Sequence, residues 1–126
     1  MPKHVPKLPG VEPGPYPFSQ VVEANGFVFL AGQVGDAPGT PGAVPGGIEA
    51  ETRAVLDNVG RLLKAVGLGY EHIVRCTVYL RDFGDFAAMN AVYREYFPTD
   101  PPARATVGVT ALAADYAVEI EVTAAR

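Results

Sequence analysis

The stretch IEAETRAVLDNVGRLLKAV, residues 48–66, decides the fold class of this chain. Its apolar residues fall one, three or seven positions apart, which places them on one stripe of a helix with charged residues over the rest of its surface. Acidic residues near the start, a basic residue near the end and Gly67 directly afterwards agree with the helix dipole and with a helix stop. We therefore expect an amphipathic helix over 48–66 that needs an apolar layer to pack against.

Outside this helix the apolar pattern changes to a period of two, which is typical of β-strands. Residues 73–80 (IVRCTVYL) are β-branched and alternating, and an Asn25-Gly26 turn joins two short apolar runs into a hairpin. A second helix, capped by Asp82 or Asp85 and stopped by Pro98, follows residues 73–80. The predicted elements are strands over 19–23, 27–31, 73–80, 103–109 and 118–123 and helices over 48–66 and 82–97.

The order ββαβαββ predicts an α+β fold with a mixed sheet that carries both helices on one face. The length of 126 residues fits one domain over 1–126. Residues 1–17 contain six prolines and are expected to form an extended arm. Residues 32–47 are a Gly/Pro-rich loop, for which we expect neither a helix nor a central strand.

Composition limits the classes of partner. A net charge of −4 without a basic stripe argues against nucleic acid as the main partner. Cys76 is the single cysteine, so the chain forms no disulfide of its own, and its place on the apolar face of a strand predicts a core residue. No stretch reaches the ~20 apolar residues of a membrane helix, so we expect no membrane partner and a cytoplasmic location. Neither His4 nor His72 has a partner at ligand spacing, and we expect no metal.

Strand alternation predicts one apolar face under the helices and a second, more polar face. We expect that second face to present Arg75, Thr77, Arg104, Thr106, Glu119 and Glu121. A solvated face is one interpretation. The run Phe27–Leu30, apolar on both sides of one strand, favours the other interpretation, in which a second copy of the chain covers part of the sheet.

Short motifs occur in a fixed order over nearly the whole chain. They are Gly14-Pro15-Tyr16, Ala31-Gly32-Gln33, Leu56-Asp57-Asn58-Val59, Asp82-Phe83-Gly84-Asp85-Phe86 with Asn90 and Tyr93, Pro102-Ala103-Arg104 and Val118-Glu119-Ile120-Glu121. With these motifs at this spacing the chain resembles the RidA (YjgF) family. The resemblance implies a chorismate-mutase-like fold, a homotrimer, and active sites in the clefts between subunits. It also implies hydrolysis of 2-imino acids, tautomers of reactive enamines, to 2-oxo acids and ammonia, without a cofactor.

The resemblance, read with the chemistry of the side chains, assigns roles. Arg104 offers a planar fork that binds a carboxylate through two hydrogen bonds. Glu119 would orient or deprotonate the attacking water and pass protons to the nitrogen. Tyr16 would close the pocket, and Thr106 would act through its main chain. The expected catalytic residues are thus Arg104 and Glu119, and the expected substrate-binding residues are Tyr16, Ala31, Gly32, Phe86, Asn90 and Thr106.

Plainer interpretations stay open for the same residues. Arg104 and Glu119 fit a structural ion pair, Tyr16 an anchor for the arm, and Asn90 a hydrogen bond within its helix. Ala31 stands where many family members have serine, and Ala105-Thr106 where many have Ser-Cys. We therefore carry two hypotheses, a 2-iminobutanoate/2-iminopropanoate-type deaminase and a non-catalytic module that binds a small carboxylate. The acidic balance disfavours a third, RNA cleavage.

Overall fold

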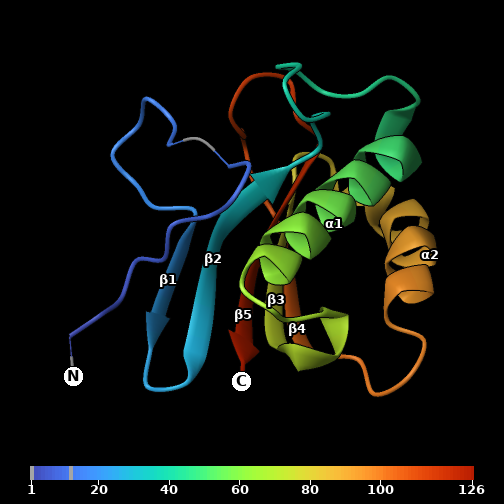
Figure 1. Ribbon diagram of the computed structural model, residues 1–126. Coiled ribbons are helices and arrows are strands. Elements are labelled where there is room, and N and C mark those ends of the chain that lie inside the picture. Colours follow the sequence, from blue (N-terminus) through green and yellow to red (C-terminus); the bar gives the residue numbers. More distant parts are fainter. Residues whose placement is uncertain (1, 12) are drawn as a thin grey trace.

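One sheet and two helices make up the two layers of the structure, a computed structural model that describes residues 2–11 and 13–126 (Figure 1). The predicted order ββαβαββ is confirmed. The elements are β1 (Val21–Ala24), β2 (Phe27–Val34), α1 (Gly47–Ala65), β3 (Ile73–Leu80), α2 (Phe86–Tyr96), β4 (Ala103–Gly108) and β5 (Val118–Ala125), with single 3₁₀ turns over Tyr70–His72 and Phe83–Asp85.

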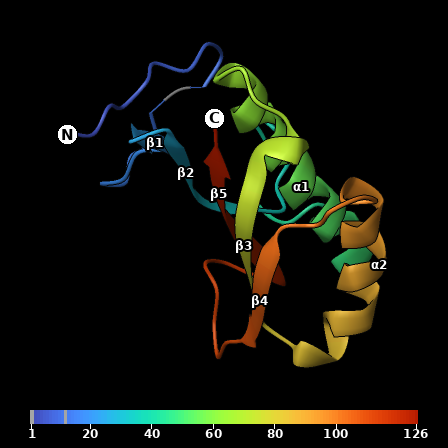
Figure 2. The same cartoon turned by 90° about the horizontal axis from the view of Figure 1, so that it is seen from below.

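The sheet has the strand order β1-β2-β5-β3-β4. All neighbouring strands are antiparallel except β3 and β4, which run parallel because α2 connects them as a crossover. Both helices lie on the same side of the sheet, as Figure 2 shows. The predicted mixed sheet with two helices on one face is therefore confirmed, and β4 is one of its two edges.

The core lies between the sheet and the helices. The stripe predicted for the first helix is buried, with Val55, Leu56, Val59 and Leu63 each 0% exposed. Strand residues at every second position meet it, among them Val28, Val78, Leu80, Val118 and Ile120. Cys76 is fully buried, as its place in the pattern predicted. No helix in the described part of the chain has the length and apolarity needed to cross a membrane.

Local turn and cap chemistry follows the sequence. Asn25 and Gly26 both have positive φ, 52° and 81°, which is the geometry that a tight hairpin between β1 and β2 requires. Asp82 accepts a hydrogen bond from the backbone N–H of Gly84 at 2.9 Å, so it is the cap. Asp85 makes no such bond, and the predicted helix over 82–97 accordingly begins as a 3₁₀ turn.

Two predictions about the strands are wrong, the start of the loop at residue 32 and the simple alternation over residues 73–80, and both lie at β-bulges. β2 continues through Gly32 to Val34 in the middle of the sheet, past a register shift between Leu30 and Gln33, where a loop was expected. In β3 the register shifts between Ile73 and Arg75. The extra residue, Val74, is exposed and Ile73 is buried, the reverse of simple alternation.

The predicted face of β4 is also wrong. Cys76 is the register partner of Arg104, and Val78 is the partner of Thr106. Because partners in a parallel pair point to the same side, Arg104 and Thr106 face the helices. The alternate residue Val107 lies on the uncovered face and is 40% exposed.

Hydrogen bonds fix two segments outside the sheet, the N-terminal arm and the Gly/Pro-rich loop. In the arm, His4 exchanges two bonds of 2.8 Å with Glu23 of β1, which gives the expected extended conformation there. The Gly/Pro loop is fixed at Val44, whose N–H donates to the Gly35 carbonyl at 2.9 Å. Gly42 donates to the buried Tyr116 hydroxyl at 3.1 Å. These contacts hold the loop against the segment that leads into β5.

Candidate active site

Arg104 lies at the rim of the sheet in a cleft between β4 and α2. The cleft has a volume of about 280 Å³ and is lined by Asn90, Tyr93, Arg94, Phe97, Pro101, Pro102 and Arg104. The guanidinium carbon of Arg104 is 4.7 Å from the ring centroid of Tyr93 and 5.8 Å from that of Phe86. Within residues 2–11 and 13–126, no carboxylate forms an ion pair with it. The cleft therefore presents an uncompensated positive charge.

The helix residues around this charge share one face of α2. Phe86, Asn90 and Tyr93 are four and three positions apart, which is the spacing of neighbours on a helix surface. Thr106 lies two residues beyond Arg104 on the same face of β4. The structure thus brings together four of the predicted site residues: Phe86, Asn90, Arg104 and Thr106.

Glu119 lies on the opposite, uncovered face of the sheet. Its register partners are Tyr79 in β3 and Val34 in β2. Gly32 in β2 makes room for its side chain, because a Cβ atom on Gly32 would lie 2.9 Å from Cδ and 3.2 Å from Cγ of Glu119, and closer still to Oε2. Gly32 therefore allows the Glu119 carboxylate to lie against the backbone of β2.

The environment of Glu119 favours a proton-transfer role. Burial raises the pKa of Glu119 above its ordinary value, and the nearby charge of Glu121 raises it further. Glu121 itself accepts a hydrogen bond from the Tyr79 hydroxyl at 2.5 Å. A carboxyl group whose pKa moves toward neutrality exchanges protons more readily at working pH.

Two of the remaining predicted residues, Ala31 and Gly32, lie on the side of Glu119. Ala31 and Gly32 form the bulge of β2, and the N–H of Ala31 donates to the Gln20 carbonyl at 2.9 Å. Tyr16 is on the arm, where its side chain is 70% exposed, and the structure does not place it beside Glu119. The second group is therefore Ala31, Gly32 and Glu119. One copy of the chain does not join it to the Arg104 cleft, because the sheet separates them.

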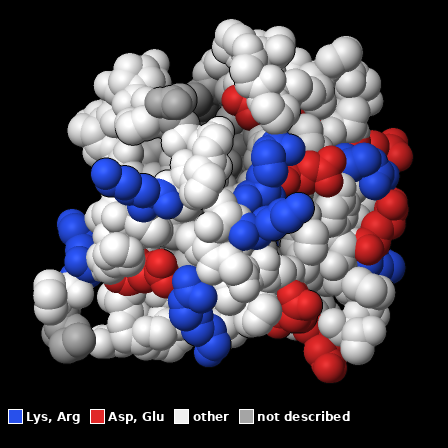
Figure 3. Space-filling model, in the orientation of Figure 1, with Lys and Arg blue, Asp and Glu red and all other residues white. Residues whose placement is uncertain are grey.

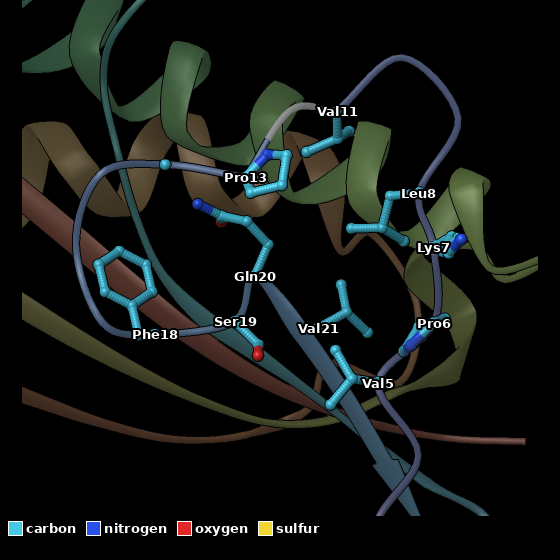
Figure 4. A pocket seen from close by; sticks show the side chains of 11 residues that line it. Val5, Pro6, Lys7, Leu8, Val11, Pro13, Phe18, Ser19, Gln20 and Val21 are labelled. Carbon is cyan, nitrogen blue, oxygen red and sulfur yellow. The ribbon is translucent and has the colours of Figure 1, made fainter.

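A cavity of about 440 Å³ lies between the arm and β1. Figure 4 shows the side chains of Leu8, Val11 and Val21 directed into this space. Leu8 and Val11 also pack against the main core. Among the residues that the structure describes, the cavity shares no lining residue with the Arg104 cleft, and its largely apolar walls anchor the arm that carries Tyr16.

Sequence reasoning missed two features of this region. Tyr93 was named in a family motif but given no role in the site, although its ring is the nearer of the two aromatic rings over the guanidinium. The spacing of Phe86, Asn90 and Tyr93 was the signal that could have found it. The hydrogen bond between Tyr79 and Glu121 was also missed, although strand alternation places both residues on one face.

Positively and negatively charged side chains are mixed on the surface of the protein that Figure 3 shows. On the face seen in Figure 3, Lys and Arg side chains are interspersed with Asp and Glu, and they form no continuous basic stripe there. Among the described residues, no group of three or more His, Cys, Asp or Glu side chains is arranged to hold a metal ion.

Comparison with known proteins identifies the class. Residues 12–126 match the family model described as Endoribonuclease L-PSP. A 2-iminobutanoate/2-iminopropanoate deaminase from Capra hircus is 41% identical over 110 residues, covering 87% of this chain and 80% of that protein. The solved RidA of the Antarctic bacterium Psychrobacter sp. superimposes with a TM-score of 0.89 at 29% identity, covering 98% of this chain and 99% of that one. Escherichia coli TdcF, solved with bound serine, gives 0.83 at 34% identity, covering 90% and 91%.

The fold and these matches place the protein among small α+β proteins of the YjgF type. The chain belongs to the RidA (YjgF) family.

Proposed function

We propose that this protein hydrolyses reactive 2-imino acids to 2-oxo acids and ammonia, in clefts formed between copies of the chain. The observation that carries the proposal is the division of the site into two halves, an uncompensated guanidinium on one face and a carboxylate of raised pKa on the other. Deaminase relatives at about 40% identity support the reaction class. The bound serine in TdcF supports a small carboxylate as ligand.

The two halves have complementary chemistry. Arg104 binds the substrate carboxylate through the edge of its guanidinium. Glu119 takes a proton from water, whose oxygen bonds to the C=N carbon while the C=N electron pair moves to nitrogen. Glu119 then returns the proton to nitrogen. In the second step the C–N bond breaks, the hydroxyl proton passes to the departing nitrogen, and the products are the 2-oxo acid and ammonia. Neither step requires a cofactor.

A second copy of the chain is needed to join the halves, and we propose the homotrimer that the family resemblance implies. The uncovered face supports such a contact because it exposes large apolar side chains. Phe27 is 45% exposed and Phe29 is 44% exposed on that face. Exposed apolar groups of this size, set among charged ones, are typical of protein interfaces. Asn90, Phe86 and Thr106 would then line the cleft of one copy, and Tyr16, Ala31 and Gly32 that of its neighbour.

Mixing two inactive variants tests the proposal. The imine is generated in situ from an amino acid by a dehydratase or an oxidase, and its loss is followed by trapping with semicarbazide. Arg104→Ala and Glu119→Gln are each expected to abolish the acceleration. Copies of the two variants, refolded together in equal amounts, should regain about a quarter of wild-type activity, since about one subunit contact in four then unites an intact Arg104 with an intact Glu119. No recovery in a mixed oligomer would refute the shared site.

The alternative is a module that binds a small carboxylate without turnover, and the Arg104 cleft supports binding in either case. Titration with 2-oxobutanoate separates the two. Binding that Arg104→Ala removes, with no acceleration of imine loss by the wild type, would establish the alternative.

The description of the family as endoribonuclease also makes RNA a control substrate, and repurified protein is expected not to cleave it. The fully buried, lone Cys76 supports the expected cytoplasmic location.

A further inference from the structure

Two aromatic rings of α2 face the guanidinium of Arg104. The Tyr93 centroid is 4.7 Å from its central carbon and the Phe86 centroid is 5.8 Å away, both within the range of cation–π attraction. Phe86 and Tyr93 are seven residues apart, so two helical turns place them on the same face of α2. The guanidinium is thus held by a rigid helix as well as by its own strand.

The Tyr93 ring is itself fixed. Its side chain is 6% exposed, and its ring packs against that of Phe97 with 4.6 Å between centroids. Burial is the main cause that raises the pKa of the Tyr93 hydroxyl. The neighbouring Cys76 thiol raises this pKa further, and the Arg104 guanidinium lowers it. Burial and the packing against Phe97 therefore restrict the movement of the Tyr93 ring.

The Tyr93 hydroxyl has no hydrogen-bond partner in the described part of the chain. A buried hydroxyl without a partner makes no favourable contribution to folding. Phenylalanine would fill the same space without this cost. The ring of Tyr93 lies against the guanidinium of Arg104, and phenylalanine would keep that contact.

We propose that Tyr93, assisted by Phe86, is a positioning residue that holds the guanidinium of Arg104 by its flat face. Stacking occupies the face of the group and leaves its N–H edge free to meet a carboxylate in the plane. An arginine held in this way does not have to be ordered when the ligand arrives, so binding is stronger. The inference rests on the proposed role of Arg104 as the carboxylate anchor.

Three variants test the inference. Tyr93→Leu removes the ring, and Tyr93→Phe keeps it. Val92→Ala is the matched control, because Val92 is also buried in α2, at 2% exposure, but does not line the Arg104 cleft. The first measurement is the ¹⁵N–¹H NMR signal of the Arg104 Nε–H in the resting oligomer. Wild type and Tyr93→Phe should share an upfield ring-current shift, which Tyr93→Leu should lose and Val92→Ala should keep.

The second measurement is the dissociation constant for 2-oxobutanoate, together with KM and kcat. Loss of the stacked ring should weaken binding and raise KM by about 10-fold, with a smaller change in kcat, because the interaction acts on bound substrate and transition state alike. Tyr93→Phe should stay within about 2-fold of wild type. If Tyr93→Leu does not fold, Phe86→Leu serves in its place, with an expected effect of about 3-fold from the more distant ring.

Two results would overturn the inference. One is an Arg104 signal and a 2-oxobutanoate affinity that Tyr93→Leu leaves unchanged. The other is a Val92→Ala variant that loses as much as Tyr93→Leu, since the effect would then come from general loosening of α2. The NMR and binding measurements need no turnover. A wild type that shows the stacked signal and binds 2-oxobutanoate but does not accelerate imine loss would refute the proposed function and leave this inference standing.

Discussion

Gly32→Ala is the substitution that tests the position of Glu119 most directly. The new Cβ would lie 2.9 Å from Cδ and 3.2 Å from Cγ of Glu119, and closer still to Oε2. Ordinary carbon–oxygen contacts are about 3.4 Å or longer, so the carboxylate would have to retreat by about 1 Å. The backbone of Gly32 does not have positive φ, so alanine is allowed there.

This substitution should lower kcat/KM and leave the free energy of unfolding almost unchanged. The atoms that the Cβ meets belong to one flexible side chain, so the free energy of unfolding should change by no more than about 1 kcal/mol. A 1 Å misplacement of a catalytic group can cost about 10²-fold in rate. We therefore expect a fall in kcat/KM of between about 10-fold and 100-fold with an almost unchanged unfolding midpoint.

The assay is the in situ imine assay, with urea unfolding measured in parallel. Gly108→Ala is the matched control, because it adds a Cβ to another strand glycine whose nearest neighbour is Phe83 Cδ1 at an ordinary 3.5 Å. In a Glu119→Gln background, Gly32→Ala should cost little more, since the two changes act on the same group. Wild-type turnover by Gly32→Ala would show that the carboxylate need not lie against β2, and the reasoning would fail.

Three further changes have defined outcomes. Glu121→Gln removes a charge that raises the pKa of Glu119, so the acidic limb of the kcat/KM profile should move to lower pH, and an unmoved limb would contradict this. Burial raises the folded-state pKa of Glu51, so its contribution to stability is present at low pH and lost as pH rises through that pKa. Glu51→Gln keeps an acceptor for the Ala117 N–H and should flatten this decline in urea unfolding, whereas an unchanged slope would argue against it. Phe29→Asp places a charge on the uncovered face and should dissociate the oligomer in sedimentation velocity, and an intact oligomer would exclude that face as the contact.

The elements of the fold could be predicted because each is encoded locally. The stripe over residues 48–66 needs only helical geometry to bury Val55 and Leu56. The Asn25-Gly26 turn needs only its tolerance of positive φ. The bulges at Val74 and in β2 near Gly32 depend on pairing with neighbouring strands. The alternation of residues within one strand therefore cannot predict them.

The face of Arg104 could not be predicted for a related reason. Alternation puts the apolar residues Ala103, Ala105 and Val107 on one side of β4 and Arg104 on the other, which predicts the wrong side of the strand as the core side. The choice is made by the pairing of Cys76 with Arg104. An edge strand beside α2 also lets a charged group face the helices, because the cleft at the rim stays open to water. The motifs named the site residues, whereas the tertiary register decided which of them share a surface.

The separation of the two halves has a consequence for how activity depends on assembly. Arg104 and Glu119 lie on opposite faces of the hydrogen-bonded sheet. The proposed reaction uses both groups and would therefore join the rim of one copy to the uncovered face of another. Specific activity should then fall on dilution together with the oligomer, and Phe29→Asp should lose both at once. A dissociated variant that kept full activity would mean that one of the two groups is not needed.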